Sequence, residues 1–467
     1  MAKKIYPPGP KGTFPTGVLG QMQNRRLHFL LETARTYGDL VHFRVGPRHV
    51  YMLNHPDYIR YVLVEAPEKF NKSPNLKKTT RKSIGQGLLT SEGDFHKRQR
   101  RLAQPAFHHK RIAAYGEVMV DYTRRMLDTW QPGEQRNIAH EMTNLTMQIV
   151  ARTLFDAEVS DEMDALGRAI TIGIETVGQR ITQPVYLPDW IPTPHNVERR
   201  KAAQLLEKTI TGIINERRES GEDKGDLLSM LLLAVDEEDG GQMTNRQVRD
   251  EVMTLFIAGH ETTANALAWS LYLLAQHPQV EAKLVAELAE ALDGRLPTMQ
   301  DLPKLRYTDM VIKESMRLYP PAWIGSREAT EDITLGGYDI ARGSIVVMSQ
   351  YVMHRHPRYF DEPEQFMPER FADEDRIPRY AYFPFGGGPR VCIGNSFAMM
   401  EAALVLATIM QRYHLALVPG RQVEPEPLVT LRPRDGIWME VAVRGRYDDP
   451  VGATCQVAPT KVQPRAS

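Results

Sequence analysis

The chain has very little cysteine, with only two cysteines in 467 residues. Two cysteines cannot form a disulfide framework, so we expect a reducing compartment and a core held by apolar packing. One of them, Cys455, lies in a polar C-terminal stretch. Net charge is also absent, because Lys plus Arg and Asp plus Glu are equal at 58 each. This balance gives no overall attraction to nucleic acid, and a charged partner must bind a local patch.

Long apolar runs are missing as well. No stretch approaches the roughly 18 uninterrupted apolar residues of a membrane-spanning helix. The N-terminus, MAKKIYPPGPKG, has no apolar core of signal-peptide length. We therefore expect a soluble, cytoplasmic protein. Peripheral contact with a membrane, or the trimming of an anchor before the proline-rich start, stays open as an alternative.

No Ser/Gly-rich linker, charge block or repeat divides the body of the chain, which predicts one large domain. Helical periodicity dominates from Pro105 to about Tyr319. Strand-like runs lie before and after it, at Val41–Val45, His49–Leu53 and Ile333–Gln350. The expected fold class is mainly α with a small β-sheet region. We place the domain at residues 1–443 and expect a flexible tail at 444–467.

The most informative segment is the glycine-rich loop Phe385–Gly394, with the sequence FGGGPRVCIG. Its three consecutive glycines permit a close approach of the backbone to a flat group, and Gly394 is expected to free the turn after the sulfur. A phosphate-binding loop is excluded, because no Gly-Lys-Ser/Thr follows the glycines. A flexible loop beside a structural cysteine is the remaining alternative.

Cys392 is expected at a helix N-terminus, because the apolar spacing of Asn395–Tyr413 predicts a helix. Unpaired amides and the helix dipole favour an anionic sulfur there, and Arg390 places a cation two residues before it. These features predict a thiolate.

The loop resembles the haem-binding loop of the cytochrome P-450 family, in which a cysteine thiolate ligates the iron. The resemblance implies the cytochrome P-450 fold, a helix-rich single domain, over roughly Pro7 to Val443. It also implies that Cys392 is the axial ligand of a haem b iron. Phe385, Gly386 and Arg390 would be further cofactor contacts.

A long helix is predicted from Thr244 to Gln276, with a capping box formed by Thr244 and Gln247. Its centre, AGHETT, interrupts an apolar face and is expected to bend or bulge the helix. A solvated polar stripe is the alternative. By the resemblance, Thr262 hydrogen-bonds dioxygen over the haem and Glu261 helps to relay protons; His260 is given no role.

Cations are expected to bind the two haem propionates. His96 and Arg100 lie four residues apart on one predicted helical face, although the family more often has Trp at the position of His96. Arg327 and Arg390 match further propionate-binding arginines of the family. In the family, a Glu-x-x-Arg motif also pairs with the arginine of a Pro-Glu-Arg-Phe segment. This resemblance implies a structural role for Glu314, Arg317 and Arg370.

The expected substrate is an apolar small molecule, since the residues that match the family's pocket positions are mostly apolar. These residues are Leu89, Ala258, Ala322, Trp323, Ile324 and Val429. The resemblance implies a monooxygenase that hydroxylates or epoxidises such a substrate. A peroxide-using peroxygenase or isomerase on the same fold, and a haem-based sensor or electron carrier, are the alternatives.

Electrons are expected from a separate partner, because no GxGxxG in a strand-to-helix context and no second cysteine cluster occur. Ten Lys or Arg residues lie between Lys77 and Arg111, against only Glu92 and Asp94. This excess predicts docking of an acidic ferredoxin or flavodoxin, which has its own reductase. We expect a monomer that binds no nucleic acid.

Overall fold

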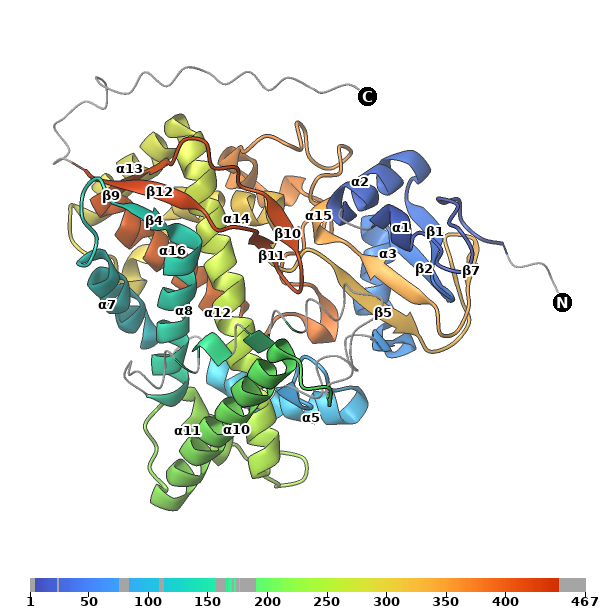
Figure 1. Cartoon of the computed structure of the whole chain (residues 1–467), viewed down its shortest axis with the longest axis horizontal. Helices are drawn as coiled ribbons and strands as arrows, with labels where there is room; N and C mark the ends of the chain where they lie inside the picture. Colours follow the sequence, from blue (N-terminus) through green and yellow to red (C-terminus); the bar gives the residue numbers. More distant parts are fainter. Residues whose placement is uncertain are drawn as a thin grey trace.

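The computed structural model describes residues 5–22, 25–74, 84–108, 113–156, 165, 167–169, 172, 173, 176 and 190–444. Except for Arg444, the tail expected at 444–467, including Cys455, lies outside these residues. Helices dominate and the sheets are small, as the sequence predicts (Figure 1). In Figure 1 the sheet region with α2 and α3 lies on one side of the molecule, while α7, α8 and α16 lie on the other. None of the helices among the described residues combines the length and apolarity needed to span a bilayer.

The described helices include thirteen α-helical segments and several short turns of helix. The α-helices are α1 (Leu19–Met22), α2 (Arg26–Tyr37), α3 (Pro56–Arg60), α5 (Gly93–Ala103), α7 (Tyr115–Leu127), α8 (Ile138–Phe155), α10 (Pro194–Ser220), α11 (Leu227–Leu233), α12 (Asn245–Gln276), α13 (Pro278–Leu292), α14 (Arg306–Leu318), α15 (Gln350–Met353) and α16 (Asn395–Arg412). The short turns used below are η1 (Tyr61–Glu65), η4 (Met299–Lys304), η5 (Pro368–Ala372) and η6 (Glu374–Arg376).

The main sheet has five strands in the order β1-β2-β8-β5-β3. Smaller sheets pair β4 and β9 with β12, β6 with β7, and β10 with β11. The strand bounds are β1 Leu40–Val45, β2 Arg48–Leu53, β3 Phe70–Lys72, β4 Gln135–Asn137, β5 Gly325–Ala329, β6 Ile333–Leu335, β7 Tyr338–Ile340, β8 Ile345–Met348, β9 Tyr413–Leu417, β10 Pro425–Pro427, β11 Leu431–Pro433 and β12 Trp438–Val443. The strand-like runs predicted at Val41–Val45 and His49–Leu53 are confirmed and form the β1–β2 hairpin. The predicted run Ile333–Gln350 gives the separate β6–β7 sheet and strand β8 of the main sheet.

Helix α12 runs through the middle of the molecule and packs along α8 (Figure 1). The predicted capping box is confirmed: Thr244 Oγ1 accepts from the Gln247 amide, and the Gln247 side chain accepts from the Thr244 amide. Of the expected bend or bulge, the bulge is wrong, because α12 is one continuous α-helix, and the bend stays a prediction. Its central threonines are accommodated by i−4 hydrogen bonds, from Thr262 to Ala258 O at 2.7 Å and from Thr263 to Gly259 O at 3.1 Å.

A buried ion pair holds the segment before the cysteine loop against α14. Glu314 and Arg317 are fully buried, and Arg317 donates to both carboxylate oxygens at 2.7 and 2.9 Å. Arg317 also donates to the carbonyl oxygens of His354, Pro363 and Gln365. Arg370 on η5 donates to Glu314 at 3.1 Å. The structural role predicted for these three residues is confirmed.

Candidate functional site

The loop at Phe385–Gly394 is closed by its own backbone. The Cys392 amide donates to Phe385 O at 3.0 Å, and the Val391 amide donates to Gly388 O at 3.1 Å. Gly388 has a φ of +64°, and a Cβ added there would lie 1.8 Å from Leu63 O on η1. A glycine is therefore required for the loop to pack on η1.

Gly394 does not need to be glycine for its backbone conformation, contrary to the prediction. Its φ is −94°, which any residue adopts, and a Cβ added there meets nothing closer than 3.8 Å. The residue serves instead as the N-cap of α16. The Gly394 amide hydrogen-bonds the Cys392 sulfur, which lowers the pKa of the thiol.

Cys392 lies two residues before the N-cap of α16, close to the helix N-terminus as predicted, and its side chain is accessible. The surrounding protein still raises the pKa of Cys392, because removal from bulk water disfavours the thiolate. Arg100 lowers that pKa, and its guanidinium donates to Val391 O at 2.7 Å. The nearby cation is thus Arg100 on α5 rather than Arg390.

Arg390 points to a different partner. It forms an ion pair with Glu92 and donates to Ser91 O at 3.0 Å. The protein groups alone do not produce the predicted thiolate, since burial is the largest influence on the pKa of Cys392. A metal cation bound to the sulfur would supply the missing stabilisation.

Basic side chains gather beside this loop. Lys72 on β3 and Arg327 on β5 are direct cross-strand partners, so two like charges face each other. Burial lowers the pKa of Arg327 to about 10, with Arg390 as the next cause. Burial also holds the pKa of Lys72 well below its usual value, with Arg327 and Arg390 adding to the effect. Among the described groups that act on Lys72 and Arg327, Glu92 is the one carboxylate.

His96 lies in the same basic cluster. Its side chain is buried, and burial lowers its pKa to about 3, with Arg390, Lys72, Arg100 and Arg327 as further causes. His96 is therefore neutral at pH 7 in the absence of an added anion. The structure thus brings together all four side chains that the sequence predicts for propionate binding.

Two members of this cluster, Lys72 and Glu92, were missed by sequence reasoning. Lys72 joins it only through the pairing of β3 with β5, which local pattern does not reveal. Glu92 immediately precedes α5 and accepts from the Lys72 amide as well as from Arg390. The sequence did offer a signal for Glu92, because this acid stands just before the helix that carries the predicted propionate ligands His96 and Arg100.

On α12, Thr262 is half-buried and Ala258, one turn earlier, is exposed. Glu261 Oε1 accepts a hydrogen bond from Thr430 Oγ1 at 2.8 Å, and Asn265 donates to the same hydroxyl at 3.2 Å. Thr430 was not predicted. His260 faces the opposite way, where it is buried and its backbone oxygen accepts from Thr146 of α8.

The model of one family, Cytochrome P450, matches residues 7–438 of the chain. The chain belongs to the cytochrome P450 family. It is 40% identical over 421 residues to cyclooctat-9-en-7-ol 5-monooxygenase of Streptomyces melanosporofaciens, an alignment that covers 88% of this chain and 91% of the relative. It is 39% identical over 414 residues to cyclooctatin synthase of the same organism, which covers 88% and 90%.

A third relative, pentalenene oxygenase of Streptomyces avermitilis, is 35% identical over 416 residues, with 88% of this chain and 91% of the relative covered. This P450 is an oxidoreductase, a haem-thiolate monooxygenase that uses haem b. The residues present fit that cofactor. Clustered cations with one carboxylate among them suit two propionates, and an accessible cysteine suits the iron.

The predicted pocket residues of the P450 differ in the exposure of their side chains. Ala258 and Ala322 are exposed, and Leu89, Ile324 and Val429 are half-buried, so these five can line an open space. Trp323 contradicts its prediction. It is 5% exposed, packs into the apolar cluster behind the main sheet and donates to Leu428 O at 3.1 Å. The N–H of a buried indole needs such a partner.

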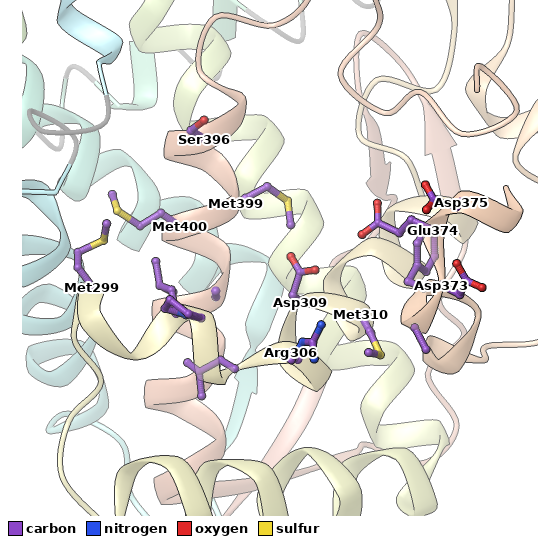
Figure 2. Close-up of a pocket in the computed structure, with 16 residues that line it drawn as sticks. Met299, Arg306, Asp309, Met310, Asp373, Glu374, Asp375, Ser396, Met399 and Met400 are labelled. Carbon is purple, nitrogen blue, oxygen red and sulfur yellow. The ribbon is translucent and has the colours of Figure 1, made fainter. Parts of the chain in front are cut away.

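A separate cavity of about 630 Å³ lies between η4, α14, η6 and α16 (Figure 2). None of the predicted pocket residues lines it. Three of its four acidic side chains are paired: Lys313 contacts Asp309 and Glu374 at 2.6 and 2.5 Å, and Arg376 contacts Asp373 at 2.9 Å. This cavity is therefore separate from the predicted substrate positions.

Proposed function

We propose that the substrate of this P450 is a terpenoid-like molecule, an apolar ring system with few or no hydroxyl groups. The support is the naming of its relatives, which act on cyclooctat-9-en-7-ol and pentalenene. The predicted pocket positions Leu89, Ala258, Ala322, Ile324 and Val429 carry no polar side chain, in agreement with such a substrate.

The test is a spectral screen of the holoprotein. Cyclic terpene hydrocarbons and alkenols should displace water from the haem iron and shift its Soret band, whereas fatty acids, steroids and macrolides should bind more weakly. A fatty acid that bound more tightly than every terpenoid would contradict the proposed class. Product analysis with the tightest ligand then identifies the oxidised carbon.

We propose Cys392 as the axial ligand, with Lys72, His96, Arg100, Arg327 and Arg390 around the propionates. Phe385 and Gly386 are proposed contacts of the porphyrin face. The support is the direction of the pKa shifts. The pKa values of Lys72 and Arg327 are lowered, so their charged forms are disfavoured and a bound anion would stabilise them. When bound, the haem supplies the activation of dioxygen and the insertion of one oxygen atom.

Proton delivery is proposed for Thr262 and Glu261. The Thr262 hydroxyl donates to Ala258 O, which leaves its oxygen lone pairs able to accept a hydrogen bond from a donor on the open side of α12. The neighbouring Glu261 carboxylate, bonded to Thr430, can exchange protons with that hydroxyl through water.

Thr262→Ala should leave substrate binding unchanged but uncouple electron consumption from product formation, because protons are no longer delivered correctly to the reacting oxygen. The ratio of product formed to electrons consumed should fall by about a hundredfold, the low end of an acid–base contribution, and peroxide should rise. Thr262→Ser, which keeps the hydroxyl, is the matched control. Unchanged coupling in Thr262→Ala would remove this residue from the mechanism.

A ferredoxin or flavodoxin, reduced by its own reductase, is proposed as the electron donor. The support is the Lys and Arg excess between residues 77 and 111 and the contact of α5 with the cysteine loop through Arg100. Four of these ten cations are described, and Arg98 and Arg101 pair with Asp236. Among the described residues, the exposed Lys97 pairs with the surface residue Asp94, so Lys97→Glu should slow reduction at low salt and have little effect at high salt.

A further inference from the structure

The loop that carries Leu89 is held by two adjacent carboxylates of α12. The Gln86 amide donates to Asp250 Oδ2 at 2.7 Å, and the Leu88 amide donates to Glu251 Oε2 at 2.9 Å. Both carboxylates are buried, so each hydrogen bond to them is shielded from water. Two consecutive acids on one helix turn thus bind two alternate amides of one loop.

The loop fits this turn of α12 closely. Gly85 has a φ of +72°, and a Cβ added there would lie 2.0 Å from Asp250 Oδ1. A Cβ added at Gly87 would lie 2.2 Å from Thr254 Oγ1. The loop is also closed on itself, because Thr90 Oγ1 donates to Gly85 O at 2.7 Å. Its position therefore follows that of α12 rather than varying independently.

Glu251 connects the loop to α5 as well. Gln99 of α5 is fully buried and donates to Glu251 Oε1 at 3.1 Å. One carboxylate thereby joins α12, the Leu88 loop and the helix that carries His96 and Arg100. Burial raises the pKa of Glu251 to about 7, and Asp250 adds to the rise, while the bonds from Leu88 and Gln99 oppose it.

Helical periodicity places this acid on the same face as the proposed reaction site. Positions seven and eleven residues apart on an α-helix point in nearly the same direction. Glu251, Ala258 and Thr262 have this spacing and lie on one continuous helix. Leu88 and Leu89 of the loop that Glu251 holds, and Ile257 next to Ala258, pack against the same apolar cluster.

We propose that Glu251, assisted by Asp250, is a specificity-determining positioning residue: it fixes Leu88 and Leu89 at the wall of the substrate space and so limits the size of the ligand that reaches the haem. It does not touch the reacting atoms. The proposal needs the haem that the family binds but no particular substrate.

The test compares two iron ligands of different size, imidazole and 1-phenylimidazole, by Soret titration of the holoprotein. Glu251→Ala should change the dissociation constant of 1-phenylimidazole by about tenfold, the effect of one lost buried hydrogen bond, and leave that of imidazole within twofold. Glu251→Gln, which can still accept from the Leu88 amide, should restore most of the wild-type ratio. Hydrogen exchange of the peptide 84–92 should accelerate by about tenfold in Glu251→Ala.

Two further variants keep the proposal falsifiable if Glu251→Ala does not fold. Gly85→Ala displaces the loop from its own side and should shift the same ratio. Glu281→Gln alters a buried carboxylate of α13 that bonds His414 and Arg444, and should leave the ratio unchanged. Faster exchange in 84–92 with an unchanged ratio, or an equal change for both azoles, would overturn the proposal.

Discussion

Glu314 shows how a buried charge is kept stable at a single position. Its carboxylate accepts from Arg317, Arg370 and the Met367 amide, so both of its oxygens have a donor. Removing one partner from such a network leaves an uncompensated charge in the protein interior.

Glu314→Gln should therefore destabilise the protein by about 3–5 kcal/mol, because Arg317 would be left buried without its counter-ion. Thermal or urea unfolding of the holoprotein measures this change. The control is Glu369→Gln, an acid of the partly exposed pair with Lys283, which should cost no more than about 1 kcal/mol. Equal effects of the two substitutions would show that the Glu314 network is not special.

For Arg327 we predict the opposite effect on stability, because this residue lies directly opposite Lys72 on the paired strands β5 and β3. In haem-free protein Arg327→Gln should increase the free energy of unfolding by about 1 kcal/mol, since a like-charge contact is removed. In the holoprotein it should hasten haem loss, measured by transfer to an excess of haem-free globin. Arg48→Gln, in a partly exposed pair on the same sheet, is the control for both measurements. A variant that lost stability without haem and retained haem normally would contradict the propionate assignment.

Helix α12 joins stability and function at the scale of one element. Its N-terminus is fixed by Thr244, its middle carries Thr262, and Glu251 lies between them. Thr244→Ala should cost about 1 kcal/mol, because the Gln247 amide loses its cap acceptor, whereas Thr244→Ser should be nearly neutral. Urea unfolding of the two variants distinguishes the cap from a general effect of substitution.

The raised pKa of Glu251 predicts a pH dependence of stability. The folded protein keeps this proton up to about pH 7, whereas the ordinary glutamate pKa is 4.5. Between these values the folded state binds more protons, so stability falls as pH rises, by about 3 kcal/mol in total. Glu251→Gln should remove this part of the dependence. The difference in unfolding free energy between wild type and Glu251→Gln, measured at pH 5 and pH 8, should therefore grow in favour of the variant at pH 8; no change with pH would contradict it.

The helices and hairpins could be predicted because their signals are local. Thr244 with Gln247 marks the start of α12, and the Gly46 turn separates β1 from β2. Contacts between distant segments could not be predicted in this way. The pairing of Lys72 with Arg327 and of Glu261 with Thr430 depends on how the strands and loops assemble in space.

Across the whole molecule, the sheet region and the helices meet where three distant parts of the chain converge. The β3–β5 pair supplies Lys72 and Arg327, α5 supplies His96 and Arg100, and the loop before α16 supplies Cys392. No single one of these segments could contact both the propionates at the edge of a haem and the iron at its face. Haem bound to these converging charges is therefore expected to stabilise the fold.

The central claim is that the Cys392 sulfur ligates the haem iron, and the carbon monoxide difference spectrum of the reduced protein tests it most directly. Wild type and Cys455→Ser should both show the red-shifted Soret band of a thiolate-bound haem. Cys392→Ser should lose that band while any haem it retains still binds carbon monoxide. Retention of the red-shifted band in Cys392→Ser would contradict the account.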